Sequence, residues 1–92
     1  MDVDLAVGRR LRARRRLLGF TQQRVADACG VTFQQIQKYE SASSRLSART
    51  LWKLAETLDV EIGYFFEELP RKADADRRGS RAKLAHADRP SF

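Results

Sequence analysis

Apolar residues recur at three- and four-residue intervals along most of this chain, a spacing that predicts amphipathic helices. Val7, Leu11 and Leu18 fall on one face of the first such segment, and the segment from Leu51 to Leu58 repeats the pattern. There is no sustained alternation and no Asn-Gly or Asp-Gly hairpin turn, so strands are not expected. The pattern predicts a compact all-α fold of five helices, at about residues 7–18, 22–29, 33–40, 48–58 and 62–69.

The ends of these segments carry residues that suit helix boundaries. Thr21, Thr32 and Ser47 each precede a helical segment, and their hydroxyl groups can accept a hydrogen bond from the first turn. Gly19 and Gly30 follow helical segments, where glycine readily takes the left-handed conformation that ends a helix. The connections are therefore predicted to be very short.

Large apolar residues are concentrated before Pro70. We therefore expect residues 1–69 to form one helical domain with a single modest core. From Arg71 onward only Leu84 and Phe92 are large and apolar, too few to bury a core. Residues 70–92 are expected to be a basic, flexible tail.

The net charge of +6 is unevenly distributed. Residues 1–20 carry six Arg against two Asp, and residues 70–92 carry seven basic residues against three acidic ones. Residues 21–69 between them carry five basic and seven acidic residues. A nearly neutral centre with basic ends favours a polyanionic partner, nucleic acid before an anionic membrane.

The composition argues against several other classes of protein. Cys29 is the only cysteine and His86 the only histidine, so neither a disulfide within the chain nor a zinc site is expected. No glycine-rich phosphate loop or nucleophile–base pair is present, so no enzyme, cofactor or metal is expected. No run approaches the ~20 apolar residues of a membrane span, and no signal peptide is visible, which favours a cytoplasmic protein without a membrane partner.

The segment "GVTFQQIQKYE" has an unusual polar face. If Ile36 and Tyr39 point into the domain, the outward face carries Phe33, Gln34, Gln37 and Lys38. Glutamine can pair with adenine in the major groove, lysine can reach guanine acceptors, and an aromatic ring can contact a thymine methyl group. The alternative is an ordinary solvated face, but that would more naturally carry Glu and Lys pairs than three amides. Base reading is the favoured interpretation.

The spacing of small and apolar residues around Gly30 is that of a helix-turn-helix, since Ala26 lies four residues before it and Ile36 six after it. In "TQQRVADACGVTFQQIQKYE" the chain resembles the Cro/C1-type (Xre-like) family of phage and bacterial repressors. The resemblance extends through "GRRLRARRRLLGFTQ" and "LSARTLWKLAETLDVEIGYFF", about residues 7–66. It implies a lambda-repressor-like DNA-binding domain.

The resemblance also implies contacts with the DNA backbone. Gln22 matches a position that typically contacts a phosphate beside a helix N-terminus, and Thr32 is a further candidate. Arg45 and Arg49 resemble the basic residues that approach the backbone or the minor groove. The family often has glycine soon after the third helix, whereas this chain has "SASS", which leaves the path of this loop open.

Two charged residues fall on apolar helix faces. Arg15 lies four residues after Leu11, and Glu40 lies four residues after Ile36. Because an unpaired buried charge is costly, we predict an Arg15–Glu40 ion pair, which related repressors also have. Direct phosphate contact by Arg15 is the alternative.

The cluster "YFF" is too dense for a short helix to bury completely. Most of it should lie in the core, with Phe65 and Phe66 beside Ile62, and the remainder should contact a second copy. Ile62, Tyr64 and Phe65 are the candidate contacts of a twofold homodimer, since related repressors pair through this region. Such a dimer would place two third helices ~34 Å apart, one turn of DNA.

Taken with the resemblance, these features predict a transcriptional regulator, encoded by a bacterium or phage, that binds an inverted repeat in double-stranded DNA and represses by covering a promoter. The rival hypothesis is an antitoxin-like module that neutralises a partner protein, for example through its basic tail, and autoregulates its own promoter. RNA binding is disfavoured because stacking aromatics on a sheet are absent.

Overall fold

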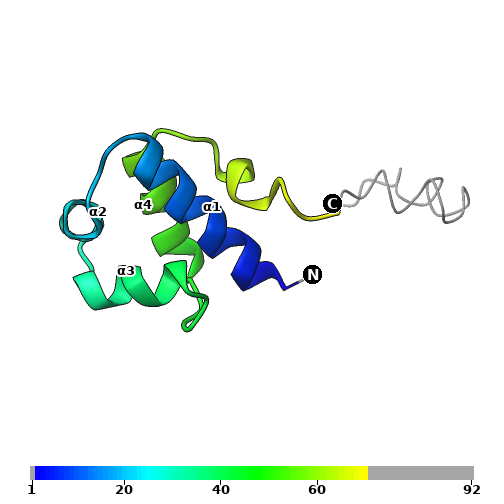
Figure 1. Cartoon of the computed structure of the whole chain (residues 1–92), viewed down its shortest axis with the longest axis horizontal. Helices are drawn as coiled ribbons and strands as arrows, with labels where there is room; N and C mark the ends of the chain where they lie inside the picture. The colour runs from blue at the N-terminus through cyan, green and yellow to red at the C-terminus, as the bar shows by residue number, and fades with distance from the viewer. Residues whose placement is uncertain (1, 71–92) are drawn as a thin grey trace, which may run out of the picture.

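The computed structural model describes residues 2–70, and within them the chain is helical without any strand. The elements are α1 (Val3–Leu17), α2 (Gln22–Cys29), α3 (Phe33–Glu40), α4 (Ala48–Leu58) and the 3-10 helix η1 (Ile62–Phe66) (Figure 1). The predicted all-α class is confirmed. The predicted tail, except for Pro70, lies outside the described residues.

Side-chain caps begin all four α-helices. Thr21, Thr32 and Ser47 accept hydrogen bonds from the backbone N–H three residues later, as their positions in the sequence predict. The first helix starts earlier than predicted, at Val3, because the Asp2 carboxylate accepts from the Asp4 N–H at 3.0 Å. Each cap satisfies a donor that the helix itself cannot pair.

Each α-helix also ends in the same way, with a left-handed residue and a pair of backbone hydrogen bonds that form a Schellman motif. Gly19 and Gly30 take this conformation at φ 75° and 71°, as predicted. After α3 and α4 the position is held by Ala42 and Asp59, at φ 62° and 56°. Ala42 belongs to the "SASS" loop, so this loop makes a turn that glycine adopts more easily.

The core lies where α1, α2, α3 and α4 converge and is closed at one end by η1. Its members are buried apolar side chains from all five elements: Val7, Leu11, Val25, Ala26, Cys29, Ile36, Tyr39, Leu54, Ala55, Leu58 and Phe65. The sequence pattern predicted most of these residues as core. Burial of this shared face holds together helices that are individually too short to be stable.

The fifth predicted helix is a 3-10 helix instead of an α-helix, and it ends at Phe66. Glu61 provides no side-chain cap, and Gly63 weakens any helix that contains it. The Tyr64 carbonyl accepts from Arg10 Nε of α1 at 2.9 Å, and the Tyr64 hydroxyl donates to the Arg10 carbonyl at 3.2 Å. These bonds, together with the Arg10 guanidinium 3.8 Å from the ring centroid, fix η1 against α1.

Gly8 lies where α1 closely approaches the end of α3. A Cβ atom at this position would lie 2.5 Å from the Tyr39 carbonyl oxygen and 2.8 Å from that of Glu40. Neither oxygen belongs to a flexible side chain, so a methyl group would push the two helices apart. The pattern of apolar residues gave no indication of this role for Gly8.

We predict that Gly8→Ala lowers the free energy of unfolding by about 1–3 kcal/mol, the usual cost of overpacking, although alanine is the better helix former. Gly63→Ala is the control, because nothing lies within 4 Å of its added Cβ atom. Urea denaturation of both variants measures the difference. A Gly8→Ala protein as stable as Gly63→Ala would contradict the close approach.

Candidate nucleic-acid interface

Helices α2 and α3 are joined by three residues, Gly30, Val31 and Thr32. Ala26 and Ile36 are fully buried where the two helices meet, so the small side chain and the tight turn act together as predicted. The Val31 N–H donates to the Ala26 carbonyl at 3.0 Å, which fixes the turn. The result is a helix-turn-helix with α3 along one edge of the molecule (Figure 1).

Within residues 2–70, the side chains at the central positions of the outward face of α3 make no hydrogen bond or ion pair. Gln34, Gln37 and Lys38 are exposed, and Phe33 is half-buried at the first position. The amide of Gln35, in contrast, donates to the Tyr39 hydroxyl at 3.2 Å, which ties it to the domain. The exposed amides and amine can donate to base edges, and the amides can also accept, as a major-groove reader requires.

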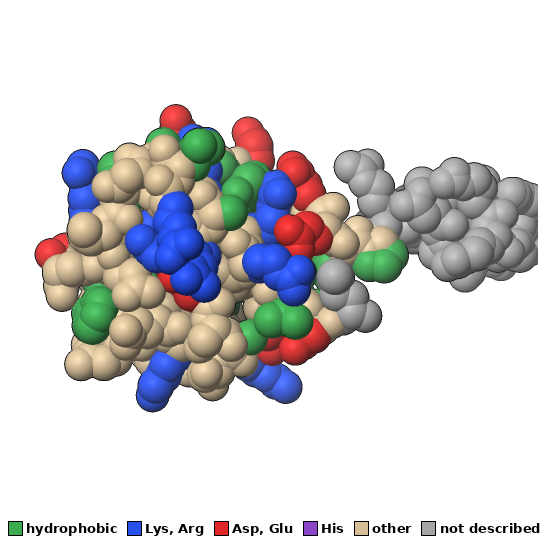
Figure 2. Space-filling model, in the orientation of Figure 1, with side chains coloured by type: hydrophobic (Ala, Val, Ile, Leu, Met, Phe, Trp, Pro, Cys, Tyr) green, Lys and Arg blue, Asp and Glu red, His purple; other side chains and the backbone are tan. Residues whose placement is uncertain are grey.

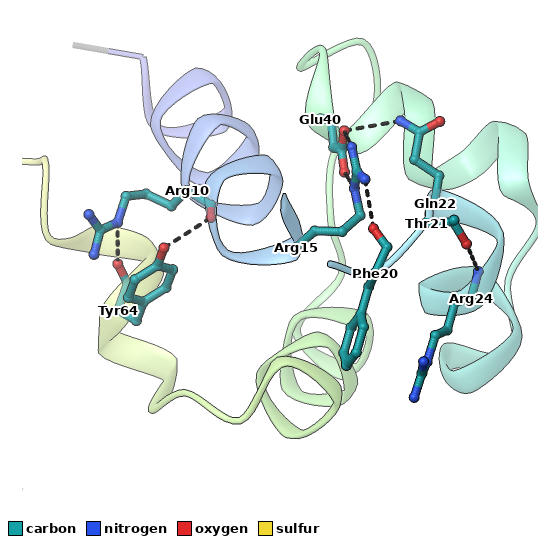
Figure 3. A network of polar contacts seen from close by, with 8 residues as sticks. All are labelled: Arg10, Arg15, Phe20, Thr21, Gln22, Arg24, Glu40 and Tyr64. Carbon is teal, nitrogen blue, oxygen red and sulfur yellow. Dashed lines mark hydrogen bonds and ion pairs between the residues drawn. The ribbon is translucent and has the colours of Figure 1, made fainter. Parts of the chain in front are cut away.

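The structure brings Arg15 of α1 and Glu40 at the end of α3 together (Figure 3). Arg15 Nε and Nη2 donate to the two carboxylate oxygens of Glu40 at 2.5 and 3.1 Å, and Arg15 Nη1 donates to the Phe20 carbonyl at 2.9 Å. The two side chains are only 11% and 5% exposed. A bidentate pair of this kind joins α1 to α3 and to the turn before α2.

Gln22 is held by the same carboxylate. Its Nε2 donates to Glu40 Oε1 at 3.0 Å, and this orientation is the only favourable one because a carboxylate can only accept (Figure 3). The side chain predicted to contact phosphate is therefore positioned in advance, with its second N–H available. Eighteen residues separate Gln22 from Glu40, so no local pattern in the sequence indicated this contact.

The other predicted backbone contacts lie at helix starts or in the loop. Thr32 accepts from the Gln35 N–H at 3.1 Å, which leaves its hydroxyl hydrogen available to a phosphate. Arg45 and Arg49 are exposed, in the loop before α4 and in its first turn. Neither side chain has an acidic partner among residues 2–70.

An open polar cleft of about 500 Å³ lies between α1 and the helix-turn-helix. Its lining comprises Arg12, Arg15, Arg16, Gln22, Gln37, Glu40 and Ser41. Figure 2 shows basic side chains gathered on this face of the molecule. Arg12 and Arg16 were not among the predicted site residues. This helix contains six arginines, and the sequence alone does not show which of them are available to a ligand.

The candidates for dimer contacts need correction. Phe65 is fully buried, so it is a core residue and cannot lie at a surface between two copies. Tyr64 is partly buried and bonded to Arg10, which leaves Ile62, 37% exposed, as the accessible candidate. Trp52, which the sequence interpretation overlooked, is 60% exposed and lines a shallow cavity of about 150 Å³ together with Ile62.

Within residues 2–70, no three His, Cys, Asp or Glu side chains are grouped so that they could hold a metal ion. The same part of the chain contains no helix with the length and apolar character needed to cross a membrane.

A family model described as helix-turn-helix matches residues 11–65, more than half of the chain. The chain belongs to the Cro/C1-type helix-turn-helix family. The match runs from the middle of α1 to η1 and includes α2, α3 and α4, the elements that build the site. The resemblance found in the sequence is confirmed.

Relatives of this helix-turn-helix protein are named as transcriptional regulators. An uncharacterized HTH-type regulator of Sinorhizobium fredii, y4aM, is 44% identical over 78 residues, 85% of this chain and 54% of its own length. One from Rhodospirillum rubrum, in an ATPase CF(0) region, is 49% identical over 69 residues, 75% of this chain and 64% of its own. The chain thus spans between half and two thirds of the length of these relatives.

Two solved structures share the fold. The restriction-modification controller protein C.AhdI of Aeromonas hydrophila is 28% identical, with a TM-score of 0.66 over 68% of this chain and 96% of its own. The clp gene regulator ClgR of Corynebacterium glutamicum gives 0.72 over 95% of this chain and 90% of its own. At 20% identity, ClgR is similar in fold alone.

We predict strong energetic coupling between Arg15 and Glu40 in this helix-turn-helix domain. Either Arg15→Met or Glu40→Gln alone should lower the free energy of unfolding by about 3–5 kcal/mol, because the partner charge remains buried and unpaired. The double variant should lose much less than the sum. Chemical denaturation of the four proteins provides the test, and additive losses would refute the coupling.

Proposed function

We propose that this chain is a sequence-specific DNA-binding transcriptional regulator that binds an inverted-repeat operator as a homodimer and represses by covering promoter DNA. The observation that carries the proposal is the face of α3, where Gln34, Gln37 and Lys38 stand exposed on a helix fixed from behind by Ile36 and Tyr39. A rigid helix of this kind fits the major groove. The names of its relatives support the same class of function.

The proposed division of labour separates base reading from backbone binding. Gln34, Gln37 and Lys38, with Phe33 against a thymine methyl group, read bases. A second group of residues, Gln22, Thr32, Arg45 and Arg49, holds phosphates and so sets the register of α3 in the groove. The basic residues of the segment 70–92 add attraction that is independent of sequence.

Selection of bound sites from a random duplex pool tests the proposal directly. We expect the full chain to enrich a short site with twofold symmetry, with half-sites about one helical turn apart. Failure to enrich any sequence, at low as well as physiological salt, would overturn sequence-specific binding. Placing the selected site across a reporter promoter then tests whether binding represses transcription.

We predict that Gln34→Ala and Arg45→Ala have different effects on binding. Gln34→Ala should cost about 1–3 kcal/mol on the selected duplex and relax preference at one or two positions, because it removes a bidentate base contact. Arg45→Ala should weaken selected and random duplexes by similar factors and reduce the slope of log affinity against log salt by about one unit.

Salt titrations of both variants on both duplexes provide the measurement. If Gln34→Ala leaves the ratio of selected to random affinity unchanged, α3 does not read the sequence. The exposed amides would then be only a solvated face.

For the dimer, we propose a twofold interface centred on Trp52 of α4 and Ile62 of η1. Both are exposed, and the cavity they share is also lined by Ala55 and Val60, with Glu56 and Glu61 as its polar residues, so a second copy would cover mainly apolar surface. Tryptophan, together with tyrosine and arginine, is enriched among the residues that contribute most to the energy of such interfaces. One α3 reads too few bases for useful affinity, which makes pairing a requirement of the function.

We predict that Trp52→Glu abolishes the dimer, because it places a charge where apolar surface is to be buried. Leu17→Glu is the matched control, since Leu17 is 74% exposed on α1 and does not line the cavity. Sedimentation at tens of micromolar, with and without the selected duplex, distinguishes the two. A parent protein that is monomeric under both conditions would count decisively against the interface.

A further inference from the structure

The six arginines of α1 divide into two groups by their contacts. Four of them bind other parts of the domain: Arg9 to Glu68 at 3.8 Å, Arg10 to Glu67 at 2.6 Å, Arg14 to the Leu58 carbonyl at 2.9 Å, and Arg15 to Glu40. Arg12 and Arg16 make no side-chain hydrogen bond or ion pair within residues 2–70. Both of these remaining arginines line the open cleft beside the helix-turn-helix.

Arg12 and Arg16 lie four residues apart, so their side chains are neighbours on one face of α1. Two like charges at this spacing destabilise a helix. Arg16, in the last turn, is favoured by the helix dipole, but Arg12, one turn earlier, lies beyond the reach of that effect. An anion between the two guanidinium groups would convert their repulsion into attraction.

The floor of the cleft does not provide that anion. Among residues 2–70, Glu40 is the only carboxylate that lines the cleft, and both of its oxygens already accept hydrogen bonds from Arg15 and Gln22. The side chain of Glu40 is 5% exposed, so it lies beneath the surface that Arg12 and Arg16 present. The cleft therefore keeps a net positive charge at its mouth.

The rest of the lining suits a phosphate group. Gln22 is fixed with one amide N–H on Glu40 and the other available. Gln37 belongs to both surfaces, since it lines the cleft and also stands on the exposed face of α3. If α3 lies in the major groove of a duplex, the backbone of one strand must run along the edge of that groove, beside α3. Gln37 lies where this edge would meet the cleft.

We propose that Arg12 and Arg16 clamp backbone phosphates of the strand that flanks the groove entered by α3, which makes α1 a third DNA-contacting helix. The proposal rests on the proposed function and adds two contact residues to it. The guanidinium group suits this role because its donors match the geometry of phosphate oxygens. These contacts carry no base preference, so they extend the footprint of each half-site outward along the backbone without changing its sequence.

The test compares Arg12→Gln/Arg16→Gln with a control of equal charge, Arg9→Gln/Lys53→Gln. Arg9 and Lys53 are exposed and lie outside the cleft. Using the duplex selected from the random pool, we expect the cleft variant to reduce the slope of log affinity against log salt by about two units, since each phosphate contact contributes about 0.9. The control should change the slope by less than about half a unit, because removing distant charge affects only long-range attraction.

Single methylphosphonate substitutions along the selected duplex locate the contacts. Neutralising a clamped phosphate should weaken the parent protein several-fold and leave the cleft variant unchanged, whereas other positions should affect both proteins equally. Identical profiles for the parent and the cleft variant would overturn the proposal. If a duplex is enriched but the cleft and control variants show the same salt slope, the clamp is refuted and the proposed function stands. If no duplex is enriched, the proposed function itself is refuted.

A free phosphate ion is the other source of the same chemistry. Inorganic phosphate is titrated without DNA while the backbone N–H signals of Gln22 and Gln37 are followed by NMR. The clamp would be overturned if the parent protein bound phosphate at millimolar concentration, the cleft variant did not, and no methylphosphonate affected DNA binding. The cleft would then be a site for a small anion. No phosphate binding, with a methylphosphonate effect at the flanking strand, supports it.

Discussion

The buried ion pair between Arg15 and Glu40 is the interaction on which the rest of the structure depends. Removing these charges from water is expensive, and the cost is offset only because the guanidinium also reaches the Phe20 carbonyl and the carboxylate also receives Gln22. The network thereby spans α1, the turn before α2, α2 itself and α3. The same bonds that satisfy the buried charges fix the position of the recognition helix.

Local features of this fold were predictable, whereas most long-range ones were not. Thr21 and Gly30 mark helix ends through chemistry contained in a few neighbouring residues, so the sequence indicated both. The Arg15–Glu40 pair was also predictable, because a charge on an apolar face requires a partner. In contrast, the contact of Gln22 with Glu40 and the 3-10 form of η1 depend on residues far apart in the sequence, 54 residues for the bond between Arg10 and Tyr64. Periodicity within a short segment contains no information about such contacts.

The arginines of α1 illustrate how little net charge alone says about a binding surface. Arg10 and Arg14 donate hydrogen bonds to backbone carbonyls of η1 and of the end of α4. They therefore stabilise the fold, although they belong to the most basic segment. Only contacts in three dimensions distinguish a structural arginine from one that is available to a ligand. In a small helical domain, the contacts of each basic residue therefore indicate a binding surface better than the number of basic residues does.

The repeated Schellman ends also bear on how the chain folds. A left-handed residue after each α-helix reverses the chain at once, so α2 and α3 are joined by only three residues and meet early. Domains dominated by such nearby contacts fold in microseconds to milliseconds. The closure of η1 onto α1 spans nearly the whole domain and carries the largest loop-closure entropy. The helix-turn-helix is thus expected to be organised before the two ends of the domain come together.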